Sequence, residues 1–143
     1  MVPATMRDPA PGGADGTLTR LFWASYPGVP EAVTAARHHV AQVLAGAPCI
    51  DDALFALTEI AANAALHTRS GQPGGWFTVA ADVVPGVLAA VVVTDQGGPW
   101  AGRATDTYPH GLEIVAAMAT EVRVDGDDNG RTIWVIFPWA ASE

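Results

Sequence analysis

The chain has 143 residues and a formal net charge of −8, and half of its residues are hydrophobic. This length and apolar content suit a single domain with one core. All seven basic residues are arginines scattered along the chain. The clustered basic surface that nucleic-acid binding needs is therefore missing, and mechanisms that need a lysine, including the P-loop, are excluded.

Cysteine content and hydropathy bear on the compartment. Cys49 is the single cysteine, so it has no partner for an internal disulfide, and a reducing cytoplasm is the simplest setting. No apolar run approaches the roughly 20 residues of a membrane helix, and the N-terminus shows no signal-peptide pattern. We therefore expect a cytoplasmic protein with no membrane association.

The elements begin after a segment of low complexity. Residues 1–16 are rich in Pro, Gly, Ala and Asp, which predicts a disordered tail before a domain over 17–143. A strand is predicted over 17–26, ended by Pro27-Gly28. Residues 30–46 begin with Pro, end with Gly and repeat apolar residues at helical spacing, which predicts an amphipathic helix.

The remaining elements alternate between helices and paired strands. A second helix is predicted over 51–68, with Asp51 or Asp52 as its N-cap. Two hairpins are predicted, and a loop of about 14 residues without periodicity precedes a third helix. The predicted ranges are strands 76–84 and 87–95, loop 96–109, helix 110–120, and strands 121–126 and 131–139. This order predicts an α+β fold: a two-layer α/β sandwich whose mixed, mostly antiparallel sheet carries three helices on one face.

A line of polar residues follows the second helix. Glu59, Asn63 and His67 recur at steps of four, opposite the stripe that should face the sheet. Their flanks are apolar, with Phe55 and Leu66 on one side and Ile60 on the other. One interpretation is a lightly polar solvent face; the other is one wall of a covered pocket, where a carboxylate acts as a base and an amide oxygen binds magnesium.

Two loop motifs bear on whether this polar line is a solvent face or the wall of a pocket. In "TDQGGP" an Asp ends an apolar strand just before Gly97 and Gly98, so Asp95 could accept a hydrogen bond from an amino group while the glycines let a ligand approach the backbone. A plain β-turn is the alternative. In "YPHGLEIV" a helix begins after the long loop, and its free N–H groups could bind an anion. An ordinary helix start with Pro in the first turn is the alternative.

Together, these segments resemble the ATP-binding domain of the GHKL superfamily (gyrase, histidine kinase and MutL-type ATPases), with the Bergerat-type fold. The resemblance covers about residues 17–139 and is closest to the small bacterial anti-sigma-factor serine kinases and related actinobacterial ATP-binding proteins. "EIAANAALH" resembles the N box, "DQGG" and "HGL" the two glycine boxes, and "GRTIW" the Gly-Lys/Arg-Thr strand.

The resemblance implies a role for each matching residue. Glu59 would be the catalytic base and Asn63 the magnesium ligand, while His67 fits the pattern without an assigned chemistry. Asp95 would recognise the adenine amino group, with Thr132 beside it. The alternative for Thr132 is an ordinary strand threonine. The implied ATP-binding residues are Asn63, His67, Asp95, Gly97, Gly98, His110, Gly111, Leu112 and Thr132, and the implied cofactors are ATP and Mg²⁺.

Two departures from the family pattern concern catalysis. Pro109 stands where the second glycine box usually has Gly, and Pro lacks an N–H for a phosphate contact. Active kinases of this group carry an Arg just before that box, whereas here the nearest is Arg103. The resemblance implies an ATP-binding regulator with serine/threonine kinase activity towards an anti-anti-sigma (STAS-type) protein, a sigma factor as a further partner, and a possible homodimer. The alternative is a catalytically silent, nucleotide-responsive module that binds other proteins.

Overall fold

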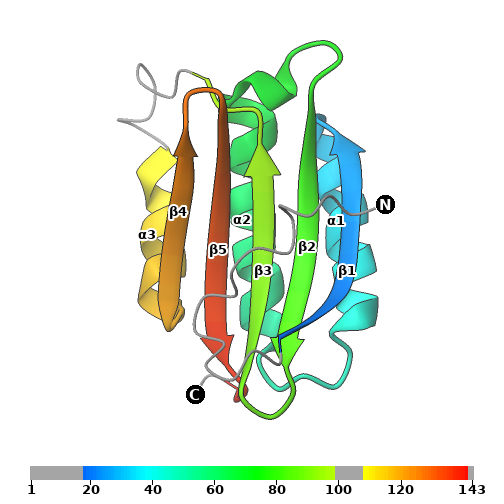
Figure 1. Ribbon diagram of the computed structural model, residues 1–143, viewed down its shortest axis with the longest axis vertical. Helices are drawn as coiled ribbons and strands as arrows, with labels where there is room; N and C mark the ends of the chain where they lie inside the picture. The colour runs from blue at the N-terminus through cyan, green and yellow to red at the C-terminus, as the bar shows by residue number, and fades with distance from the viewer. Residues whose placement is uncertain (1–17, 99–107, 142–143) are drawn as a thin grey trace.

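The computed structural model describes residues 18–98 and 108–141, and side chains of the third helix from Glu113 onward. The expected disordered tail over 1–16 lies outside these residues. The elements in chain order are β1 (Thr19–Pro27), α1 (Pro30–Val43), α2 (Ile50–His67), the short 3₁₀ turn η2 (Arg69–Gly71), β2 (Trp76–Val84), β3 (Leu88–Asp95), α3 (Tyr108–Met118), β4 (Glu121–Asp127) and β5 (Gly130–Pro138). Figure 1 shows their arrangement.

The strands form one five-stranded sheet in the order β1-β2-β3-β5-β4. All four pairings between the described strands are antiparallel, so the sheet has no parallel pair where a mixed sheet was expected. The hairpins β2-β3 and β4-β5 confirm the two predicted turns. The α+β two-layer fold is confirmed.

All three helices lie on one face of the sheet, with α2 between α1 and α3 (Figure 1). Side chains alternate between the two faces of a strand, and the odd-numbered residues of β2 and β3 face the helices. Among them Phe77, Val79, Val91 and Val93 are at most 1% exposed. The opposite side of the sheet is called the outer face below.

Helix α2 is the central element of the helical layer. Its apolar residues Leu54, Leu57 and Ala61 are buried, as their spacing predicted. The expected cap was wrong: the helix begins at Ile50 after Cys49, and no side chain caps it. Asp51 and Asp52 instead occupy the first turn, where the positive end of the helix dipole stabilises their negative charges.

Candidate functional site

The polar line of α2 lies on the flank of the helix that faces α3. Thr58 marks the other flank, because its Oγ1 accepts a hydrogen bond from Arg37 Nη1 of α1 at 3.2 Å. At 100° per residue, Asn63 lies about 140° and His67 about 180° around the helix from Thr58. Glu59, Asn63 and His67 are all half-buried. The helix therefore turns Asn63 and His67 away from α1 and towards the α3 side, while Glu59 lies between them and the Thr58 flank.

The Asn63 side chain carries an unsatisfied donor. Its Nδ2 is buried and has no hydrogen-bond partner among the described residues. A buried polar group left in this way costs about 1–3 kcal/mol, so such groups call for an explanation such as an unbound ligand. This amide is the strongest sign that a polar ligand completes the site.

The apolar border of this line differs from the expectation. Leu66 is 63% exposed and Ile60 is 1% exposed, so one flank faces outwards and the other belongs to the core. Phe55 is half-buried. The expected covered groove is therefore not formed by these residues, because Ile60 packs into the core and does not line the polar row.

Asp95 ends β3 in a buried position on the helix-facing side of the sheet. It is 3% exposed, and its Oδ1 accepts a hydrogen bond from Gly97 N at 2.6 Å. Burial raises the pKa of the carboxyl group, against the smaller lowering effects of the Gly97 hydrogen bond and the Arg131 charge. A buried carboxylate held in this way is suited to accept from a ligand's amino group.

The glycines after Asp95 let two backbone segments approach closely. Gly97 has φ +73, and a Cβ on it would lie 2.4 Å from the Asp128 carbonyl oxygen. Gly98 has φ +115, and its Cβ would lie 2.8 Å from Arg69 Cγ. The two glycines are therefore required by packing.

The segment after α2 is fastened to this loop. Arg69 N donates to Gly97 O at 2.7 Å, and Gln96 N donates to Ser70 Oγ at 2.9 Å. Ser70 is fully buried and its N–H donates to Thr68 Oγ1. The sequence analysis did not identify these two hydrogen bonds, because a single Ser in a turn does not indicate which partner it binds. They join the end of the polar helix to the Asp95 loop.

Thr132 does not lie beside Asp95, which corrects the expected geometry. In the β3-β5 register, Asp95 pairs with Arg131 and Thr94 pairs with Thr132. Because paired residues share a face and successive residues alternate, Thr132 points to the outer face. Its Oγ1 lies 3.0 Å from Thr94 Oγ1. Arg131, which the sequence analysis did not single out, is the residue of β5 on the Asp95 side.

The second glycine box lies in the first turn of α3. The helix begins at Tyr108, two residues before the predicted start, and Pro109 therefore occupies its first turn. His110, Gly111 and Leu112 follow within the helix, although their side chains are outside the described set. A helix start leaves its first N–H groups without intrahelical partners, and Pro109 supplies none. Arg103 lies outside the described residues.

Comparison with known families decides the identity of this arrangement. A family model for the histidine kinase-like ATPase domain matches residues 22–137, which is most of the chain. The chain belongs to the histidine kinase-like ATPase domain family. A search of curated proteins found no match.

Membership in the histidine kinase-like ATPase family implies an ATP-binding domain of the kinase type, for which Mg²⁺ is the usual cofactor. The residues of α2 fit such a ligand. Asn63 presents a hard oxygen donor one helical turn after Glu59, and magnesium is commonly held by one or two protein oxygens together with substrate phosphates. Within the described residues, no three His, Cys, Asp or Glu side chains gather around one point.

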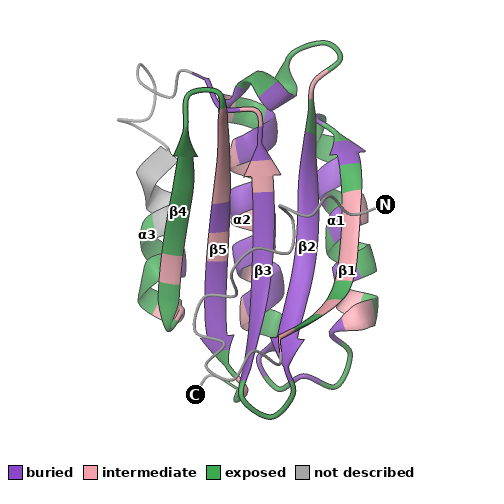
Figure 2. Cartoon of the chain, in the orientation of Figure 1, coloured by how far each residue is buried: buried purple, intermediate pink, exposed green. Residues whose placement is uncertain are grey.

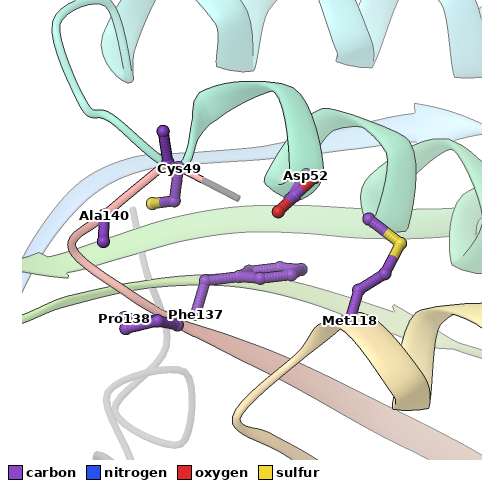
Figure 3. Close-up of a pocket in the computed structure, with 7 residues that line it drawn as sticks. Cys49, Asp52, Met118, Phe137, Pro138 and Ala140 are labelled. Atoms are coloured by element: carbon purple, nitrogen blue, oxygen red, sulfur yellow. The ribbon is translucent and has the colours of Figure 1, made fainter. Parts of the chain in front are cut away.

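A cavity of about 100 Å³ lies elsewhere in the ATPase domain (Figure 3). Its lining comprises Cys49, Asp52, Met118, Phe137, Pro138, Ala140 and Ala141. Pro138 pairs with Leu88 at the opposite end of β3 from Asp95, a separation of about 24 Å along the strand. The cavity is smaller than typical ligand pockets, which start at about 300 Å³. The cavity and the candidate ATP site are therefore separate.

Among the described residues, no helix is both long enough and apolar enough to cross a bilayer.

Proposed function

We propose that this histidine kinase-like ATPase domain is an ATP-dependent regulatory protein that phosphorylates a serine or threonine of a partner protein, in the manner of the anti-sigma-factor kinases. The observation that carries the proposal is on α2, where Glu59 lies one helical turn before the incompletely hydrogen-bonded Asn63. The family match supports ATP as the ligand.

ATP is proposed to span the region from the Asp95 loop to the start of α3. Asp95 would accept a hydrogen bond from the adenine amino group, beside Gly97 and Gly98. Asn63 would contribute an oxygen to the magnesium ion that accompanies the phosphates. The N–H groups at the start of α3, around His110 and Gly111, would face the phosphates, as helix N-termini do in many phosphate sites.

Phosphoryl transfer would use Glu59 as the base. The carboxylate accepts the proton of the partner's hydroxyl group, the hydroxyl oxygen forms a bond to the γ-phosphorus, and the bond from that phosphorus to the β-phosphate oxygen breaks to release ADP. The proposed substrate is an anti-anti-sigma protein of the STAS type, and a sigma factor is the proposed second partner. We propose a cytoplasmic setting. We also propose a homodimer, and sedimentation of the purified chain would test this oligomeric state.

A kinase assay with candidate STAS-type partners tests the catalytic part. Glu59→Ala should abolish transfer while retaining Mg-ATP binding. Asp51→Ala is the matched control, because Asp51 is an exposed acid in the first turn of the same helix. Transfer that persists in Glu59→Ala would remove Glu59 from the mechanism.

The alternative is a silent module that binds ATP and a partner without catalysis. Pro109 in the first turn of α3 favours it, because one phosphate-facing N–H is missing there. Transfer undetectable in the wild-type chain, together with an ATP-dependent change in partner affinity, would establish this function instead.

Titration with Mg-ATP tests the nucleotide itself. The five tryptophans and the melting temperature provide the readouts. Asp95→Asn should weaken binding about tenfold or more, because a hydrogen bond to a charged group contributes about 1.5–3 kcal/mol. Asp125→Asn, at an exposed position of β4, is the control. No response of the wild type at millimolar Mg-ATP would refute both candidate functions.

A further inference from the structure

The outer face of the sheet is apolar across its centre. One row of paired residues runs Trp23, Ala80, Val92 and Trp134 from β1 to β5. The next row contains Ala90 and Ile136, and Val84 and Leu88 complete a small apolar cluster with them. A sheet face of this composition is unusual in contact with water, because antiparallel sheets with one solvated face carry polar residues there.

This face is also buried within the single chain. Ala80 is 1% exposed, and Ala90 and Val92 are 3% exposed. The three helices lie on the other side of the sheet (Figure 1), yet nearly all residues of β2 and β3, on both faces, are coloured as buried (Figure 2). No described helix or strand covers this side of the sheet.

Three polar side chains on the same face, Arg20, Asp82 and Trp23, are largely shielded from water. Arg20 and Asp82 pair across β1 and β2, with Nε–Oδ1 at 2.8 Å and Nη2–Oδ2 at 3.0 Å, and Asp82 is 2% exposed. The Trp23 Nε1 atom is buried and has no hydrogen-bond partner among the described residues. A peptide segment that crosses the face offers a backbone carbonyl at every residue, which is the acceptor that this indole needs.

We propose that residues 1–17 dock on the outer face of the sheet and form its cover. The position of the residue that follows this segment supports the proposal, because Leu18 packs against the apolar cluster of this face. The length agrees as well, since 17 extended residues reach up to about 56 Å, whereas the five strands span about 19 Å in width. Val2 and Met6 are apolar side chains that could fill the shallow floor formed by Ala80 and Ala90.

A nitroxide label at residue 4 tests the docked position. Ala4→Cys is made in a Cys49→Ala background and labelled, and the unlabelled variant is compared with the wild type to check folding. The indole signals of Trp23 and Trp134 should lose intensity, whereas the amides of Thr34 and Gln42, on the exposed side of α1, should keep theirs. Equal loss at all four positions, or none at the indoles, would overturn the proposal.

A mixed sample distinguishes the segment from a second copy of the chain. Labelled, unenriched protein is mixed with unlabelled, isotope-enriched protein. Intensity loss at the indoles in this mixture would mean that the segment of another copy occupies the face, and the intramolecular cover would be wrong. Unchanged indole signals in the mixture support it.

Deletion of residues 1–17 provides a second measurement. The variant should show increased acrylamide quenching of tryptophan fluorescence, because Trp23 and Trp134 lose their cover. The same deletion in a Trp23→Phe, Trp134→Phe background is the matched control, in which the increase should disappear. Quenching that is unchanged by the deletion would contradict the proposal.

Discussion

The close approach at Gly97 gives a prediction in which backbone strain and packing can be separated. Both Gly97 and Gly86 have positive φ, +73 and +80, but a Cβ at Gly86 would meet nothing within 4 Å. Alanine at Gly86 should therefore lower the free energy of unfolding only by the cost of a left-handed conformation, about 1–2 kcal/mol.

Alanine at Gly97 carries that cost and a second one. Its Cβ would lie 2.4 Å from the Asp128 carbonyl oxygen and 2.8 Å from Gly130 N, and both are backbone atoms of the β4-β5 turn that cannot rotate away. Displacement of a packed segment costs about 1–3 kcal/mol, so the total loss should be about 2–5 kcal/mol.

Urea unfolding of both variants measures the difference, with melting temperatures several degrees apart as the second readout. Because the displaced loop holds Asp95, Gly97→Ala should also weaken Mg-ATP binding, whereas Gly86→Ala should not. Equal destabilisation by the two substitutions would refute the argument that the loop is wedged against the β4-β5 turn.

Three further predictions concern buried polar groups. Asn63→Ala should change the free energy of unfolding by less than about 1 kcal/mol, because the buried amide it removes is incompletely hydrogen-bonded, but it should abolish stabilisation by Mg-ATP in thermal melts; a large loss of stability without nucleotide would contradict this. Burial raises the pKa of Asp95, so the folded state binds its proton more tightly than the unfolded state, and stability falls as the pH rises from about 3.9 towards the folded-state pKa. The stability of Asp95→Asn relative to wild type should therefore increase between pH 4 and 7 in urea titrations, and a constant difference would argue against the raised pKa. Arg20→Ala should lower the free energy of unfolding by about 3–5 kcal/mol, because it leaves Asp82 charged and buried; the double variant Arg20→Leu, Asp82→Leu should recover most of this loss, and a single-variant loss below about 1 kcal/mol would contradict a water-free face.

The types of the helices and strands could be predicted from the sequence because the residues that begin and end them are local signals. Pro30 sets the start of α1, and short turns that contain Pro85-Gly86 and Asp128-Asn129 separate the strands of the two hairpins. Element ends were less accurate: α1 ends at Val43, three residues before the predicted Gly46. Helix ends depend on tertiary contacts, which propensities do not contain.

The candidate site was predictable where its residues are close in sequence. Glu59, Asn63 and His67 share a flank because of helical periodicity alone. The position of Thr132 required the strand register, since a shift of one residue exchanges the faces of a sheet. Arg69 and Ser70 were missed for a related reason, because their partners lie in a loop 26 to 28 residues away.

The position of Cys49 has a practical consequence. The thiol is 2% exposed, next to a cavity at the far end of β3 from Asp95, and burial raises its pKa. Thiol reagents should thus modify it only when that end of the molecule opens. The rate at which a thiol reagent modifies Cys49 in native buffer therefore measures how often the structure opens. Saturating Mg-ATP should lower this rate because it stabilises the folded state, although its proposed site lies about 24 Å from the sulfur.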